Sequence, residues 1–389
     1  MTNYLKLVLL CITMALISFE GAVIADEAGK SKIVSSKFFR HIMFRETPFA
    51  SYRGIYPVDS KTTPDFAHYK FSYDEQGRVR EIQYQINDRI IRGNEVWDSF
   101  IWFAPKVKID YQPNKEVHTY FNSRNEPFTA HGNVFKAVYQ LDDKGQRTSL
   151  KFYDEKGELS ENAWNIHRYE WRFANNKVYE KRFDIKGEQR PLRPEFRFFE
   201  VELDYDNDGK LTFLKNLGLE GKPTNNDSGA GIDRIVYDHN GNFTRWQVYD
   251  KDGNPVEGNR PMVHVGEHMY DQYGNKVGLR GFDRFGKQIG FSWGVFEHVR
   301  AYNEHGNMSE QVMLNDAGEV MGHVFMEYAD TNDTFSWLKS KDKSGNLVAT
   351  PMLGGAAALQ FVYSDSGVER KLFNADMTPY TPPTQSETD

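Results

Sequence analysis

The sequence predicts an all-β protein built from tandem repeats of about 32 residues, and a recurring turn motif carries most of this prediction. The motif is an aromatic residue or leucine, then Asp or Asn, two variable residues and Gly. It occurs in pairs whose glycines lie 12 residues apart, such as Gly241 with Gly253 and Gly274 with Gly286. The first glycines of successive pairs, at 209, 241, 274 and 306, are separated by 32, 33 and 32 residues. A constant period of this kind indicates a repeat architecture.

The motif predicts that each repeat is a three-stranded antiparallel meander followed by a linker. Asp or Asn at the start of a turn can bond to its own backbone, and Gly provides the positive φ that closes the turn. Between the two turns the residues alternate, with Trp246 and Val248 against Arg245 and Gln247. A period of two is typical of a strand with one buried face. A further strand, such as residues 232–237, leads into each pair of turns.

Repeats of this size are expected to form an open or spiralling β-sheet array. The alternative is a β-propeller, whose blades usually hold four strands in about 40 residues and number about four to eight. Here each unit has room for three strands, and the chain contains roughly nine or ten units. The first and last units depart from the consensus, as expected of units that cap an open stack.

The repeats are predicted to occupy residues 68–380, and residues 26–67 lack the motif. We expect this preceding region to be an N-terminal cap that covers the open edge of the first unit. Within it, residues 30–44 carry Ile33, Phe38 or Phe39 and Ile42 near helical spacing and are expected to form a short helix. Residues 381–389 are rich in Pro, Thr and Ser and are expected to be a disordered tail.

Residues 1–25 have the layout of a secretory signal peptide. Lys6 is followed by an apolar run over residues 7–17, and the small residue Ala25 precedes Asp26, so we expect cleavage after Ala25. The apolar run is about half of the roughly 20 residues that span a bilayer, so no permanent transmembrane anchor is expected. Cleavage would also remove Cys11, the single cysteine of the chain. The expected location is therefore outside the cytoplasm, periplasmic or secreted.

The turn motif resembles the YD-type β-hairpin repeats of bacterial secreted proteins, including the RHS group. The likeness is carried by the aromatic-Asp-x-x-Gly pentads and by Pro after the second turn, in Gly221-Lys222-Pro223 and Gly253-Asn254-Pro255. It covers most of the chain after residue 67 and implies the repeat architecture. RHS proteins enclose a C-terminal toxin, but only about a dozen residues follow the last motif here, so the resemblance implies no toxin domain.

One segment matches the first half of a calcium-binding loop. Asp204, Asp206 and Asp208 alternate before Gly209, and carboxylates at such positions suit a hard cation. Lys215, however, occupies the place of the bidentate glutamate. The same residues are in register with the repeat, so a structural turn is the favoured interpretation and calcium the alternative. No other cofactor is expected.

Two tryptophans are candidates for stacking on a glycan. Trp164 and Trp293 each lie seven residues after a second-turn glycine, Gly157 and Gly286. Aromatic rings repeated along one edge of an array could hold sugar rings. The alternative is that each ring packs over its own hairpin.

These features predict a non-catalytic binding or scaffold module whose partner is a protein or glycan of the bacterial envelope or exterior. The formal charge of −7 is of mixed sign, which argues against nucleic acid as a partner. No catalytic residues stand out. The alternative is an extracytoplasmic hydrolase whose acids are hidden among the turn carboxylates. A pocket with two carboxyls of perturbed pKa would favour the hydrolase, and a shallow groove with exposed aromatic rings would favour binding.

Overall fold

The computed structural model describes residues 32–59, 63–92, 104–329, 334–364 and 367–382. In this part of the chain it contains 25 β-strands and a single three-residue 3-10 helix. The elements are β1 (Ile33–Ile42), β2 (Gly54–Val58), β3 (His68–Asp74), β4 (Val79–Ile86), β5 (Arg89–Ile90), β6 (Lys106–Gln112), β7 (Lys115–Phe121), β8 (Lys136–Leu141), β9 (Arg147–Tyr153), β10 (Arg168–Ala174), β11 (Lys177–Phe183), β12 (Gln189–Arg190), β13 (Glu200–Tyr205), β14 (Leu211–Gly218), β15 (Ile232–Tyr237), β16 (Phe243–Tyr249), β17 (Val265–Tyr270), β18 (Lys276–Phe282), β19 (Gln288–Ile289), β20 (Glu297–Tyr302), β21 (Met308–Leu314), β22 (Val320–Tyr328), β23 (Phe335–Ser340), η1 (Pro351–Leu353), β24 (Ala358–Ser364) and β25 (Gly367–Phe373). All strands belong to one antiparallel sheet, which confirms the predicted all-β class.

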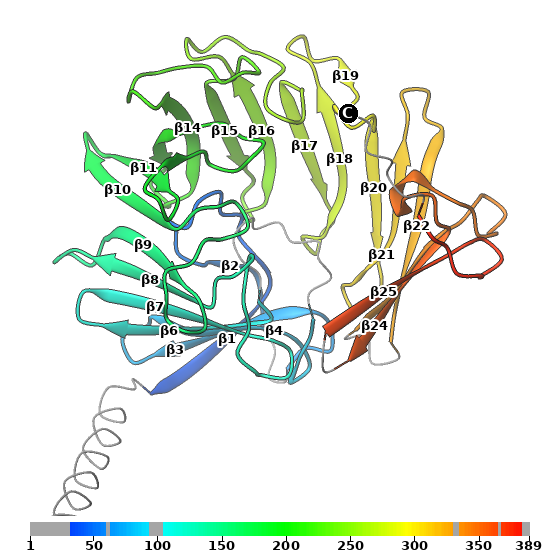
Figure 1. The fold of residues 1–389 in the computed structure, drawn as a ribbon, viewed down its shortest axis with the longest axis horizontal. Coiled ribbons are helices and arrows are strands. Elements are labelled where there is room, and N and C mark those ends of the chain that lie inside the picture. Colours follow the sequence, from blue (N-terminus) through cyan, green and yellow to red (C-terminus); the bar gives the residue numbers. More distant parts are fainter. Residues whose placement is uncertain (1–31, 60–62, 93–103, 330–333, 365–366, 383–389) are drawn as a thin grey trace, which may run out of the picture.

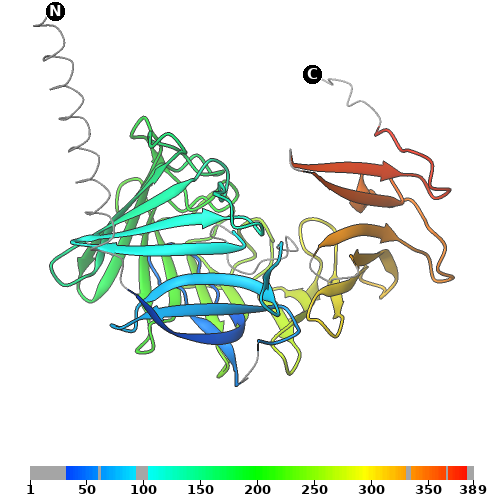
Figure 2. The ribbon, with the colours of Figure 1, turned by 90° about the horizontal axis from the view of Figure 1, so that it is seen from below.

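The sheet is open. The long strands follow one another in sequence order, except that β1 lies between β2 and β3. The two-residue strands β5, β12 and β19 pair only with the strand before them, beside β6, β13 and β20. Within the described residues, β2 and β25 are each paired on one side only, and they do not pair with each other. Figure 1 shows the sheet curling into an arc, and in Figure 2 β24 and β25 stand clear of β1 and β3. The predicted open array is therefore confirmed over the propeller alternative.

Each regular repeat contains one hairpin and a short third arm. The hairpins β15–β16, β17–β18 and β20–β21 have strands of six and seven residues. After the second glycine the chain folds back for one or two pairs only, as in the Tyr249–Pro255 bridge and the pairing of β18 with β19. A linker then crosses to the next hairpin, which pairs with the previous one over three residues. The strand predicted to lead into each pair of turns is therefore full length, as in β15, and the strand after the second turn is very short.

The turn chemistry agrees with the motif. In the turn between β15 and β16, Oδ1 of Asp238 accepts hydrogen bonds from the amides of Asn240 and Asn242, both at 2.9 Å. The amide of Gly241 donates to the carbonyl of Asp238 at 3.2 Å, and Gly241 has a φ of 92°. A side chain at Gly241 would lie 2.9 Å from Cγ2 of Ile55, whereas one at Gly253, in the second turn, would meet nothing. The first turn therefore faces the N-terminal region, and the second turn faces solvent.

The N-terminal region corrects one expectation. The part of residues 30–44 that the structure describes is not a helix, because residues 33–42 form strand β1. This strand pairs with β3 through six residues and with β2 through four. The edge of β3 offers a row of unpaired backbone groups, and pairing with them outweighs a weak helical spacing in a segment that starts with the β-branched Ile33 and Val34.

Residues 43–53, between β1 and β2, enter the inside of the arc, and we call them the inner segment. The ring of Phe44 stacks on Phe243 of β16, with centroids 4.4 Å apart. The ring of Phe49 packs against Trp171, Phe173 and Tyr205, at centroid distances of 5.5, 5.8 and 5.7 Å. Phe44 belongs to the main buried apolar cluster of the sheet. The inner segment is thus part of the core.

The N-terminal region also contacts the first turns of four successive repeats. Nη2 of Arg53 donates to the carbonyl of Asp208 at 2.8 Å, and Asn242 donates to the hydroxyl of Tyr56 at 2.7 Å. The next two contacts are His41 Nε2 to the Tyr273 carbonyl at 3.1 Å and the Ala67 amide to the His305 carbonyl at 2.8 Å. Figure 1 accordingly shows β2 inside the arc. These bonds fix the N-terminal region relative to the curled sheet.

The predicted signal peptide over residues 1–25, and residues 383–389 of the predicted tail, lie outside the described residues. Within the described residues, no helix has both the length and the apolar character needed to cross a membrane.

Candidate functional site

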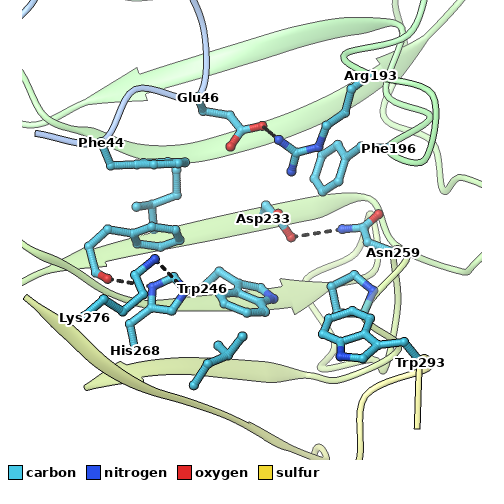
Figure 3. Close-up of a pocket in the computed structure, with 14 residues that line it drawn as sticks. Phe44, Glu46, Arg193, Phe196, Asp233, Trp246, Asn259, His268, Lys276 and Trp293 are labelled. Carbon is cyan, nitrogen blue, oxygen red and sulfur yellow. Dashed lines mark hydrogen bonds and ion pairs between the residues drawn. The ribbon is translucent and has the colours of Figure 1, made fainter. Parts of the chain in front are cut away.

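A pocket of about 260 Å³ lies between the inner segment and the inward face of β15–β18 (Figure 3). We call it the inner pocket. Its walls come from the inner segment, from strands β15–β18, and from the linkers that precede β13, β17 and β20. The lining residues are Phe44, Glu46, Arg193, Phe196, Asp233, Ile235, Phe243, Trp246, Asn259, Pro261, His268, Lys276, Leu279 and Trp293. Strands and linkers from three repeats, together with the inner segment, therefore build it.

Two tryptophans supply much of the apolar wall. The ring of Trp246 lies flat over Gly266 on the neighbouring strand, where a Cβ would come within 1.9 Å of the indole. Trp293 stacks on Phe291, with centroids 4.6 Å apart and an interplanar angle of 3°, and its Nε1 donates to Nε2 of His298 at 3.3 Å. Trp293 remains 43% exposed. One ring is therefore fixed inside the pocket, and the other is held at its solvent-accessible rim.

The polar groups of the pocket include two buried carboxyls. An oxygen of Glu46 lies 2.7 Å from Nη1 of Arg193. Oδ1 of Asp233 accepts a hydrogen bond from Nδ2 of Asn259 at 3.2 Å. Asn259 is itself positioned by Asn226, whose amide donates to it at 2.8 Å. In Figure 3, Asp233 lies between the Glu46–Arg193 pair and the ring of Trp246.

Burial sets the protonation of these carboxyls. Burial, reinforced by the charge of Glu46, raises the pKa of Asp233 to about 8, with Arg193 and Asn259 opposing the shift. Burial also raises the pKa of Glu46, although the charge of Arg193 acts in the opposite direction. At neutral pH, Asp233 is therefore mainly a neutral acid that can donate a hydrogen bond as well as accept one.

A histidine and a lysine complete the polar lining. Nδ1 of His268 donates to the carbonyl of Phe243 at 2.9 Å, and Nζ of Lys276 lies 3.4 Å from Nε2 of the same ring. The pocket thus combines aromatic walls with donors and acceptors in fixed positions. This composition suits a small ligand that has both an apolar face and several hydroxyl or amide groups.

The three aspartates for which calcium was the alternative interpretation have other partners. The carboxylate of Asp204 pairs with Lys177 and, at 3.3 Å, with Lys215. Asp206 caps its own turn by accepting from the amides of Asp208 and Lys210 at 3.0 and 2.8 Å. The carboxylate of Asp208 is largely exposed, with Lys210 at 3.6 Å. The described residues contain no group of three or more His, Cys, Asp or Glu placed to hold a metal ion.

The two predicted stacking residues lie in different surroundings. Trp293 lines the inner pocket, but Trp164 does not. Trp164 is partly buried against the main core, and its ring meets His131 edge-on at a centroid distance of 4.4 Å. The remaining lining residues were not singled out from the sequence. Asp233 did offer a signal, since it shares a strand face with the buried Ile235.

Comparison with known proteins adds little to this description. No family model and no curated protein match the sequence. Among solved structures, the chain is similar to TcdB2-TccC3-TEV, with 10% identity, a TM-score of 0.24, and coverage of 79% of this chain and 15% of that one. It is also similar to a porin-like protein from Bacteroides uniformis, with 11% identity, a TM-score of 0.25, and coverage of 88% of this chain and 95% of that one. These are distant structural likenesses, and the chain spans only a small part of the first.

Proposed function

We propose that the chain is an exported, non-catalytic binding module that acts outside the cytoplasm, and that the inner pocket holds a single sugar ring of a glycan. The observation that carries the proposal is the joint presence of Trp246 and Trp293 with the buried polar groups of Asp233, Asn259 and Arg193. A sugar ring presents a C–H face to an indole and hydroxyls to carboxyl, amide and guanidinium groups.

The size of the pocket supports one ring and not a longer chain. Its volume of about 260 Å³ is below the roughly 300–1,000 Å³ typical of sites for drug-sized ligands. Because Trp293 stands at the exposed rim, a glycan could continue from the bound ring into solvent. The turn motif's resemblance to YD-type repeats of secreted proteins supports a scaffold role for the rest of the sheet.

Titration with D-glucose, D-galactose, N-acetylglucosamine and their methyl glycosides, followed by tryptophan fluorescence, tests this proposal. We expect a saturable signal with at least one of these sugars. Trp293→Ala should weaken that binding about tenfold or more, since stacking and rim closure are lost together.

Trp164→Ala is the matched control, because this tryptophan occupies the corresponding linker position two or more repeats away and does not line the pocket. It should leave the affinity within about twofold. No binding of any of these sugars at millimolar concentration, or equal losses in the two variants, would contradict the proposal.

A glycoside hydrolase is the second candidate, because the pocket holds two carboxyls of raised pKa. Asp233 has the protonation expected of a general acid. Such enzymes, however, need a second carboxylate that stays ionised beside the sugar, and their two carboxyls usually have pKa values pushed apart. Here burial raises the pKa of both carboxyls, and Glu46 forms an ion pair with Arg193. Release of nitrophenol from nitrophenyl glycosides that is lost in Asp233→Asn would favour this second candidate.

A further inference from the structure

A second polar cluster lies on the inward face of β7 and β8, outside the inner pocket. Glu116, His118 and Tyr120 alternate along β7, so their side chains share one face, and all three are buried. Tyr139 of β8 pairs with Glu116 across the sheet and lies on the same face. Its ring centroid is 4.9 Å from that of His118. Four polar side chains therefore face the interior at this point.

The inner segment covers this face with two further polar groups. The guanidinium carbon of Arg45 lies 3.7 Å from the ring centroid of Tyr52, and the Tyr52 ring is 6.0 Å from that of His118. Nη1 of Arg45 donates to the carbonyl of Ala50 at 2.8 Å, which holds the arginine within its own loop. Arg45 is 2% exposed. The guanidinium is thus enclosed between the inner segment and β7.

Several donors in this cluster lack a hydrogen-bond acceptor among the described residues. They are Nε and Nη2 of Arg45 and the hydroxyls of Tyr52, Tyr120 and Tyr139. Burial raises the pKa of both Tyr120 and Tyr139, so these hydroxyls keep their protons. Buried donors without acceptors are strongly unfavourable, and five of them within one buried cluster call for an acceptor.

The charges in the cluster do not balance. The carboxylate of Glu116 forms an ion pair with Arg147, whose Nη2 lies 2.5 Å from Oε1. It also accepts a hydrogen bond from Nε2 of His118 at 2.6 Å. Burial opposes ionisation of Glu116, but Arg147 holds its pKa well below the usual range. Burial lowers the pKa of His118, against the charge of Glu116, so the imidazole is neutral. One positive charge, that of Arg45, is left without a carboxylate among the described residues.

We propose that Arg45, with the hydroxyls of Tyr52, Tyr120 and Tyr139, forms a binding site for a small monovalent anion of the halide class. A water molecule would satisfy the hydroxyls but would leave the buried guanidinium uncompensated, whereas an anion does both. Tyr52 also lines an open groove of about 860 Å³, which gives small ions a route to the site. The anion would fasten the inner segment to β7 and β8.

Thermal unfolding in sodium bromide and in sodium gluconate at equal ionic strength tests the site. Gluconate is too large to enter, so the matched ionic strength isolates specific binding from screening. We expect the melting temperature to rise with bromide concentration in a saturable way and not to rise with gluconate. Tyr139→Phe removes one donor and keeps the ring, and it should weaken the apparent bromide affinity about tenfold.

Arg45→Met should abolish the bromide response, whereas Arg284→Met, in an exposed ion pair with Glu257, should leave it intact. If Arg45→Met does not fold, anomalous diffraction from wild-type crystals soaked in bromide decides the question. A peak between the Arg45 guanidinium and the tyrosine hydroxyls supports the site. Equal responses to bromide and gluconate, or no such peak, would overturn it.

Discussion

Replacing Arg182 by Met is expected to lower the free energy of unfolding by about 3–5 kcal/mol. Arg182 and Glu180 lie two residues apart on the inward face of β11, both side chains are 0% exposed, and Nη1 lies 2.8 Å from Oε1. Glu180 also accepts from Nε1 of Trp171 at 2.8 Å, and Arg182 donates to the carbonyls of Phe198 and Phe199. Removing the arginine leaves a buried carboxylate whose pKa burial already raises. Urea denaturation followed by tryptophan fluorescence measures the loss.

Two variants serve as controls for this result. Arg260→Met removes an ion pair with Glu195 whose side chains are 63% and 50% exposed, so it should cost less than about 1 kcal/mol. The double variant Glu180→Gln/Arg182→Met should recover part of the stability that Arg182→Met loses, because no charge is then left unpaired. A loss below about 1 kcal/mol in Arg182→Met would mean that this pair is not buried.

Asp233→Asn is expected to become more stable than the wild type as pH rises. The ordinary pKa of the side chain is 3.8 and its folded value is about 8, so the folded state binds this proton more tightly. The stability that the protonated carboxyl contributes is complete below about pH 4 and is lost as pH rises through 8. The amide introduced by the substitution cannot ionise. The free energy of unfolding of the variant, taken relative to the wild type, should therefore be about 2–5 kcal/mol higher at pH 9 than at pH 4.

Urea midpoints at pH 5, 7 and 9 would measure this difference. Glu46 has a pKa raised in the same direction, so the variant should retain part of the wild-type decline. Asp227→Asn is a suitable control, since this carboxylate is exposed and paired with the exposed Arg197. Parallel pH profiles for the wild type and Asp233→Asn would show that Asp233 titrates normally.

The repeats could be predicted from the sequence because their signals are local. Asp238 and Gly241 define a turn through bonds within five residues, and the same pattern recurs at Gly209, Gly253 and Gly274. The alternation of Trp246 and Val248 with polar residues then predicts the strands between the turns. Both features depend on short-range chemistry that needs no knowledge of the remaining chain.

The inner segment could not be predicted, because its structure depends on distant contacts. Arg45 and Glu46 are charged residues, which sequence rules place on the surface, yet both lie in the core. Strand β7 is misleading in a similar way, since its inward face carries Glu116, His118 and Tyr120, while Val117 and Thr119 face outward. Only the partners supplied by other repeats make these placements favourable.

One residue of the candidate site, Trp293, was predicted from the sequence. The linker position of Trp293 marked it as a stacking candidate, and Trp293 does line the pocket, but the identical offset of Trp164 leads to a ring packed against His131 instead. Trp293 lies at the pocket to which the inner segment contributes Phe44 and Glu46, and Trp164 does not line that pocket. A repeat motif by itself therefore does not distinguish the surroundings of Trp293 from those of Trp164.

The placement of the inner segment inside the arc is tested most directly by photocrosslinking. With p-benzoylphenylalanine in place of Phe49, ultraviolet light should join this residue to peptides that contain Trp171, Phe173 or Tyr205, whose rings lie within 5.8 Å of it. The same replacement at Phe285, an exposed turn residue, should give no such product. Mass spectrometry that finds the residue-49 crosslinks in β10 and β13 would agree with the structure. Crosslinks confined to residues 33–74 would contradict it.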